Sequence, residues 1–265
     1  MTIASHTETD ATLAARLAVE AGHLLVQLRE QLFSDGVPSW QVKDTGDIMS
    51  HRFLTQAFTT LRPDDAVLSE EGADTSHRIG ADRVWIIDPL DGTNEYGERG
   101  RLDWAVHIAL WEHHELTAAA VSLPAHDLVF CTDPPSPLPE RRAERPRLIT
   151  SRNRAPYAAV VVANELGCDA VRLGSAGAKA MAVVLGEADI YIHDGGMYQW
   201  DSAAPAGVAA AAGLHVSRID GSPLVYNHPD AWLPDFLVCR PELAEPVLDA
   251  LWGDRWRELR DNGWS

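Results

Sequence analysis

Two aspartates that end an apolar run, Asp88 and Asp91, are the residues of this sequence best suited to chemistry. The run before them, residues 84–87, consists of β-branched and aromatic residues and therefore predicts a short buried strand. Carboxylates at the end of a buried strand are costly unless a cation meets them. A divalent metal ion is the simplest cation that could meet both, so this run indicates a metal-dependent site.

Two further acidic clusters offer oxygen ligands of the same kind. Glu70 and Glu71 follow another predicted strand, and Asp201 precedes an alanine-rich predicted helix. Each cluster alone has an ordinary structural explanation: solvated surface for the glutamates, an Asx turn for Asp88 and Asp91, and a helix N-cap for Asp201. Together they supply hard oxygen ligands from separate strand and helix ends. Such a set suits Mg²⁺, which prefers carboxylates, carbonyls, water and phosphate.

The elements that must position these residues fall into two halves. Apolar spacing in the first half predicts an α+β arrangement, with helices at about 10–32 and 47–61 and strands at 66–69, 84–87, 104–111, 116–122 and 128–131. Strands alternate with helices in the second half, which is typical of an α/β fold: strands at 148–150, 170–173 and 190–193, and helices at about 155–166, 176–185 and 202–212.

A proline-rich segment separates the two halves. Four of the seven residues in 133–139 are prolines, which neither a helix nor a central strand accommodates. We therefore predict an N-terminal domain over residues 1–140, which carries Glu70 and the two aspartates. The predicted C-terminal domain, residues 141–265, carries Asp201 and substrate contacts.

The composition of the 265-residue chain limits the kinds of partner. A formal net charge of −17 argues against binding to a nucleic-acid polymer, but bound metal ions would still allow a small phosphorylated substrate. Three well-separated cysteines predict neither a disulfide framework nor a zinc site. The polar, acidic start of the chain lacks the features of a signal peptide, and no apolar run is long enough to span a membrane. We therefore expect a cytoplasmic protein without a membrane partner.

The order and spacing of the acidic clusters resemble the signature of the inositol monophosphatase superfamily of lithium-sensitive, Mg²⁺-dependent phosphatases. The matching segments are the glutamates at 70–71, the Asp-Pro-Leu-Asp-Gly-Thr of residues 88–93, and the Trp-Asp-Ser-Ala-Ala of residues 200–204. The likeness spans residues 10 to about 227. It implies an α/β fold with an α+β N-terminal half, layered as the αβαβα sandwich of the inositol monophosphatase and fructose-1,6-bisphosphatase type. It also implies metal ions between the two halves, and a homodimer.

Within this superfamily the chain looks most like the CysQ-type 3′(2′),5′-bisphosphate nucleotidases. The similar segments are the Thr-Gly-Asp of residues 45–47, the segment 150–154 and the segment 174–179. Residues 153–154 are Asn-Arg where those nucleotidases usually have Ser-His, and the approach to the Thr-Gly-Asp, residues 43–47, is shorter than usual.

The resemblance implies the ligands of two or three Mg²⁺ ions. Glu70, Asp88 and the backbone carbonyl of Leu90 would hold one ion. Asp88, Asp91 and Asp201 would hold a second, and Glu70 with water would hold a weaker third.

The resemblance implies catalytic and substrate-binding residues in the same way. Thr93 and Asp47 would orient and deprotonate the attacking water, with Glu70 as the third catalytic residue. Backbone N–H groups at 92–93 and 174–175 would cradle phosphate oxygens, and further side chains would contact a second phosphate, the nucleotide or sugar hydroxyls. The implied substrate contacts are Gly92, Thr93, Ser151, Arg154, Gly174, Ser175, Lys179 and Asp194.

These roles imply a phosphomonoesterase in which a metal-bound water attacks phosphorus in line, because two metal ions clamp the attacking and leaving oxygens. The expected substrate is 3′-phosphoadenosine 5′-phosphate, cleaved to AMP and phosphate, with relaxed activity on other sugar phosphates. Inositol 1-phosphate, fructose 1,6-bisphosphate and histidinol phosphate are the alternative substrates. A haloacid-dehalogenase-type phosphatase fits less well, since its two aspartates are spaced by two residues and Asp88 and Asp91 by three. A non-catalytic phosphate-binding protein would be expected to lack one of the key residues, and none is missing.

Overall fold

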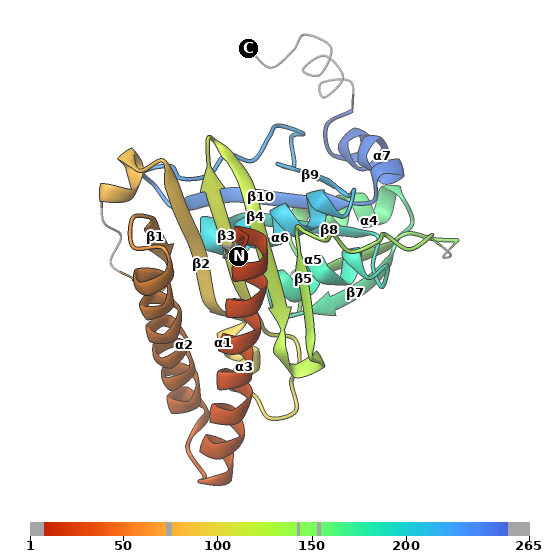
Figure 1. Ribbon diagram of the computed structural model, residues 1–265. Coiled ribbons are helices and arrows are strands. Elements are labelled where there is room, and N and C mark those ends of the chain that lie inside the picture. Colours follow the sequence, from red (N-terminus) through yellow and green to blue (C-terminus); the bar gives the residue numbers. More distant parts are fainter. Residues whose placement is uncertain (1–7, 73–75, 142–143, 153–154, 254–265) are drawn as a thin grey trace, which may run out of the picture.

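Two five-stranded sheets and three helical layers make up the computed structural model, which describes residues 8–72, 76–141, 144–152 and 155–253 (Figure 1). Helices cover the outer face of each sheet, and a further pair of helices lies between the sheets. This order of layers is the αβαβα sandwich that the resemblance implies. No described helix combines the length and the apolar character that crossing a membrane requires.

The first sheet has the strand order β1-β2-β3-β4-β5, with β1 parallel to β2 and the other pairs antiparallel. Its strands are β1 (Ala66–Ser69), β2 (Arg83–Asp91), β3 (Ala105–Glu112), β4 (Glu115–Leu123) and β5 (Leu128–Cys131). Two long helices, α1 (Asp10–Ser34) and α2 (Ser39–Leu61), pack side by side on its outer face. Short helical segments connect the strands: η1 (Ser76–Gly80), α3 (Thr93–Tyr96) and η2 (Pro124–His126).

The layer between the sheets is built from small residues. Its helices are α5 (Ala176–Val184) and α6 (Gln199–Ala211), whose buried positions are mostly alanine and glycine. The helices therefore approach the sheets closely: a Cβ atom added at Gly207 of α6 would lie 2.8 Å from the Cβ of Ala119 in β4. One continuous apolar cluster joins this layer to both sheets, so the two halves of the chain share a core.

The second sheet has the order β7-β6-β8-β10-β9, in which β6 is parallel to β7 and β8 while β10 is antiparallel to β8 and β9. Its strands are β6 (Arg147–Ser151), β7 (Asp169–Leu173), β8 (Ile190–Tyr198), β9 (His215–Ser217) and β10 (Trp232–Cys239). Helices α4 (Tyr157–Glu165) and α7 (Pro241–Trp252) cover its outer face.

The structure extends several elements beyond their predicted limits. Helix α2 begins at Ser39 rather than near residue 47, so the Thr-Gly-Asp of residues 45–47 is helical. Val42 is fully buried and Gly46, one turn later, faces the Tyr96 ring, so tertiary packing holds this polar stretch in the helix. Strands β9 and β10 and helix α7 were not predicted. The described residues between β5 and β6 form no helix or strand, as the prolines predict. The two-domain division stays a prediction.

Candidate active site

Strand β2 places its carboxylates by simple alternation. Val84 and Ile86 face the inner helical layer, whereas Trp85 and Ile87 pack beneath α1 and α2. Asp88 continues the even-numbered series and therefore points inward, toward α5 and α6. It is 1% exposed, so this aspartate lies within the strand rather than in a surface turn.

Pro89 and Gly92 shape the end of this strand. Pro89 cannot donate to the ladder, and the register between β2 and β3 shifts between Asp88 and Asp91. Gly92 has φ +85°, and a Cβ there would lie 3.0 Å from Ser175 and 3.1 Å from the Asp103 carbonyl. The chain can therefore turn at once into α3, which brings Thr93 next to the two aspartates.

Three carboxylates converge at the inner layer. Ligand atoms of Asp88, Asp91 and Asp201 all lie within 4.8 Å of one another. Asp201 is the third residue of α6. The alternative explanation, in which Asp201 is the N-cap of this helix, is therefore wrong. The Asp201 carboxylate accepts a hydrogen bond from the N–H of Tyr198 at 2.7 Å, which fixes the carboxylate at the N-terminus of the helix.

Burial, and after it mutual charge repulsion, sets the electrostatics of this cluster. Burial, then the charges of Glu70 and Asp91, raise the pKa of Asp88 well above its usual range. Burial and the charge of Asp91 likewise raise the pKa of Asp201 to about 6. Glu70 is exposed along its side chain, but its carboxyl end interacts with Asp88, and desolvation there with the charge of Asp201 raises its pKa to about 7. The leucine in this segment, Leu90, is buried; its N–H donates to Asp88 at 3.0 Å.

The pKa of Asp91 is shifted in the opposite direction from those of its neighbours. Burial alone would raise its pKa, but the charges of His107 and Lys179 and several hydrogen bonds outweigh burial and keep the pKa well below the usual range. The Ser175 hydroxyl and the N–H of Gly177, the latter at 2.7 Å, donate to Oδ2. The N–H of Ala176 donates to Oδ1 at 3.2 Å. The N-terminus of α5 thus stabilises a charged Asp91, and Oδ1 is its less occupied oxygen.

His107 is a site residue that the sequence reasoning missed. This fully buried imidazole places Nε2 3.2 Å from Asp91 Oδ2 and Nδ1 3.1 Å from the carbonyl of Trp200. Burial opposes its charged form, but Asp91 outweighs burial and raises the pKa of His107. The imidazole therefore ties β2 to the start of α6. No pattern in the sequence marks this role, and the close approach is visible only in the fold, where a Cβ at Gly177 would lie 2.1 Å from His107 Nε2.

Thr93 and Asp47 form the predicted pair. The Thr93 hydroxyl lies 3.2 Å from Asp47 Oδ1 and 3.1 Å from the Leu90 carbonyl, and it can donate to only one of them at a time. Burial, then the charge of Glu71, raise the pKa of Asp47 to about 7. A carboxylate with this pKa can accept a proton near neutral pH.

Three of the predicted substrate contacts, Gly174, Ser175 and Lys179, form hydrogen bonds to other protein groups. The N–H groups of Gly174 and Ser175 point at Asp103, with Gly174 donating to its carboxylate at 2.6 Å. Lys179 is 3% exposed; its ammonium donates to the carbonyls of Gly174 and Ser175, which keeps it from the surface.

Two further predicted contacts, Ser151 and Asp194, lie on strands of the second sheet. Ser151 ends β6 and is half-buried, and Asp194 in β8 accepts the N–H of Ala158 at 3.4 Å. Arg154 lies outside the described residues.

The donor set fits a hard divalent cation. Three converging carboxylates, two of them with pKa values raised by burial and mutual repulsion, are stabilised by a cation and not by further protein groups. The oxygens are of the type that Mg²⁺ prefers. With the adjacent Thr93–Asp47 pair, the arrangement can bind an anionic oxygen and move a proton beside it.

The molecule resembles known proteins over most of its length. Residues 14–252 match the sequence profile of the inositol monophosphatase family. The chain is 46% identical over 265 residues to a 3′-phosphoadenosine 5′-phosphate phosphatase of Mycobacterium leprae, covering 94% of this chain and 95% of the relative. It is 32% identical over 204 residues to the 3′(2′),5′-bisphosphate nucleotidase CysQ of Escherichia coli, covering 72% and 82% respectively. The structure of CysQ from Bacteroides thetaiotaomicron superimposes with a TM-score of 0.72 at 24% identity, over 89% of this chain and 98% of that one.

Proposed function

The chain belongs to the inositol monophosphatase family, and from that membership we propose that it hydrolyses 3′-phosphoadenosine 5′-phosphate to AMP and inorganic phosphate. The observation that carries the choice of substrate is the 46% identity, over 94% of this chain, to a phosphatase named for that compound. The enzyme is a phosphoric monoester hydrolase: water attacks phosphorus, and the P–O bond to the 3′ oxygen breaks.

The acidic cluster would hold the metal ions of this reaction. We assign Glu70, Asp88 and the Leu90 carbonyl to one Mg²⁺, and Asp88, Asp91 and Asp201 to another, with Glu70 also contributing to a weaker third. When bound, Mg²⁺ supplies positive charge that stabilises the phosphoryl oxygens and lowers the pKa of bound water.

The protein's own residues position the water and receive its proton. When the Thr93 hydroxyl donates to Asp47, its oxygen can accept a hydrogen bond from the attacking water, and the Leu90 carbonyl is left free for a cation. Asp47 can accept the released proton because its pKa is about 7. The backbone N–H groups of Gly92 and Thr93 begin α3 and would donate to the phosphate.

Further properties of the family are part of the same proposal. We expect inhibition by Li⁺, a cytoplasmic location and a homodimer. Sedimentation velocity at several protein concentrations would test the dimer, since a monomer would keep one sedimentation coefficient at about half the dimer mass.

A substrate panel tests the proposed activity. Phosphate release is measured with Mg²⁺, with and without Li⁺, for 3′-phosphoadenosine 5′-phosphate, inositol 1-phosphate, fructose 1,6-bisphosphate and histidinol phosphate. The nucleotide should give the highest kcat/KM, and Li⁺ should inhibit its hydrolysis. A higher kcat/KM for inositol 1-phosphate would overturn the choice of substrate.

A further inference from the structure

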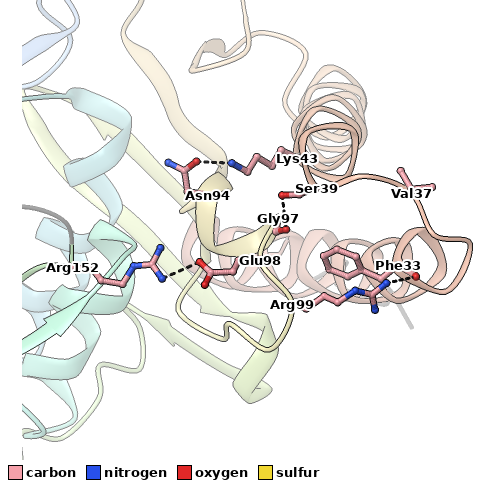
Figure 2. Close-up of a pocket in the computed structure, with 9 residues that line it drawn as sticks. All are labelled: Phe33, Val37, Ser39, Lys43, Asn94, Gly97, Glu98, Arg99 and Arg152. Atoms are coloured by element: carbon pink, nitrogen blue, oxygen red, sulfur yellow. Dashed lines mark hydrogen bonds and ion pairs between the residues drawn. The ribbon is translucent and has the colours of Figure 1, made fainter.

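A cavity of about 620 Å³ has Asn94, the residue that follows Thr93, in its lining (Figure 2). Its walls come from the end of α1, the start of α2, the turn that contains α3, and the residue after β6. None of the predicted metal ligands lines it. The cavity is therefore a separate compartment beside the reaction centre, and no role has been assigned to it so far.

The lining of this cavity is cationic. Lys43, Arg99 and Arg152 line it together with a single carboxylate, Glu98, in a chain whose formal net charge is −17. Figure 2 shows Lys43 and Arg152 reaching toward it from opposite halves of the chain. A concentration of positive charge in an acidic protein indicates an anionic ligand.

The cavity lies one helical turn from the catalytic pair. Lys43 and Asp47 are four residues apart on α2 and so share a face, at a spacing of about 6 Å along the helix. Their partners are consecutive: Asp47 Oδ1 lies 3.2 Å from Thr93, and Lys43 Nζ donates to Asn94 Oδ1 at 2.7 Å. A ribose bearing two phosphates can span this interval, with one phosphate at Thr93 and the other beside Lys43.

The cations at the cavity keep the capacity to bind an anion. The Lys43 ammonium has three N–H donors, and Asn94 takes one. The Arg152 guanidinium pairs with Glu98 at 2.9 Å and with Glu95 at 3.3 Å, and Glu98 is the exposed partner that a phosphate can displace. By contrast, Lys179 is committed to buried carbonyls and cannot reach a ligand in this cavity.

We propose that this cavity binds the phosphate that is not hydrolysed, the 5′-phosphate of the nucleotide, with Lys43 and Arg152 as its cationic contacts. The assignment rests on the proposed function and makes the cavity the determinant of bisphosphate over monophosphate substrates. Recognition of the second phosphate then comes from α2 and β6 and not from the buried lysine of α5.

The test compares two substrates that differ only in this phosphate. Lys43→Gln should lower kcat/KM for 3′-phosphoadenosine 5′-phosphate by about 10- to 100-fold, the value of a charge-assisted hydrogen bond, chiefly through KM. For adenosine 3′-phosphate, which lacks the 5′-phosphate, the loss should be at least about fivefold smaller, because only the influence of the Lys43 charge on Asp47 remains. Arg52→Gln is the matched control, because Arg52 is an exposed cation on the same helix outside the cavity.

A binding measurement gives a second readout. AMP, the product that keeps the 5′-phosphate, should bind the wild-type protein more tightly than adenosine does in titration calorimetry, and Lys43→Gln should remove most of this difference. An equal loss on both substrates, or an unchanged AMP preference in the variant, would overturn the assignment. A wild-type enzyme that does not hydrolyse the bisphosphate at all would instead overturn the proposed function.

Discussion

The acidic cluster and the cationic cavity meet at two consecutive residues, Thr93 and Asn94, but they are built differently. In the cluster, Asp88 and Asp91 are 1% and 8% exposed and receive hydrogen bonds from backbone N–H groups. In the cavity, Lys43 and Arg152 are long, partly exposed side chains that pair with other side chains. The proposed reaction centre is thus fixed by buried contacts, as positioning requires, whereas single substitutions in the proposed recognition surface should leave it undisturbed.

The largest effects are expected from substitutions of the two aspartates of β2. Asp88→Asn and Asp91→Asn should each lower Mg²⁺-dependent phosphate release at least about a hundredfold, because each removes a proposed metal ligand. Their effects on the metal-free protein should differ in sign. Asp88→Asn removes repulsion and should raise Tm by about 2–4 °C, whereas Asp91→Asn loses favourable contacts with His107 and α5 and should lower it by at least as much.

Calorimetry of both variants without metal checks the opposite signs. A fall in Tm for both variants would show that Asp88 is structurally supported in the same way as Asp91. Unchanged activity in Asp91→Asn would contradict the metal site itself.

A smaller effect is expected where one side chain links two ligand-bearing segments. His107→Gln keeps a polar group but cannot contact both Asp91 and the Trp200 carbonyl as the imidazole does. Losing such a supporting contact should weaken Mg²⁺ binding by about 10- to 100-fold. The readout is the Mg²⁺ concentration that gives half of the metal-induced rise in Tm, with exposed His126→Gln as the control. If both variants respond to Mg²⁺ alike, the role of His107 is confined to packing.

The pH dependence of stability should differ with and without metal. Glu70 and Asp201 have pKa values of about 7 and 6 when folded, against ordinary values of 4.5 and 3.8. The folded protein then binds protons that the unfolded chain has released, so its stability falls as pH rises through this window. Without metal, Tm should be about 3–6 °C higher near pH 5.5 than near pH 7.5.

Adding Mg²⁺ should shrink this difference, and so should Glu70→Gln, because both reduce the repulsion among the carboxylates. The lowered pKa of Asp91 acts in the opposite direction, contributing stability that is lost only in stronger acid. If the Tm of the metal-free protein rises steadily from pH 5.5 to 7.5, the pKa values of Glu70 and Asp201 are not raised as described.

The smallest effect is expected from a substitution in the cavity, and it should improve binding of the bisphosphate. Glu98→Gln removes the carboxylate that competes for Arg152 while leaving the backbone contacts of residue 98 in place. We expect KM for the bisphosphate to fall about two- to fivefold, with no change for adenosine 3′-phosphate. A rise in KM for the bisphosphate alone would mean that Glu98 holds Arg152 in its working position.

The sequence predicted the convergence of the acidic cluster better than it predicted the cationic cavity. Asp88, Asp91 and Asp201 could be grouped because a motif and strand ends mark them, and the structure brings them together. The cavity could not be foreseen, since Lys43 lies before the predicted helix at about 47–61 and only the tertiary packing of Val42 and Gly46 explains why it is helical. The role of His107 was equally hidden, because its partners are 16 and 93 residues away in the chain.

The thin layer of alanines between the sheets has a consequence for how this protein can evolve. Asp91 and Asp201 are carried by the first sheet and by α6, so their separation depends on how closely that helix lies against β4. A single added methyl group at Gly207 meets Ala119 and pushes these two surfaces apart. Natural selection for catalysis must therefore also act on alanines and glycines that lie far from the bound phosphate. Larger residues at these positions would lower kcat.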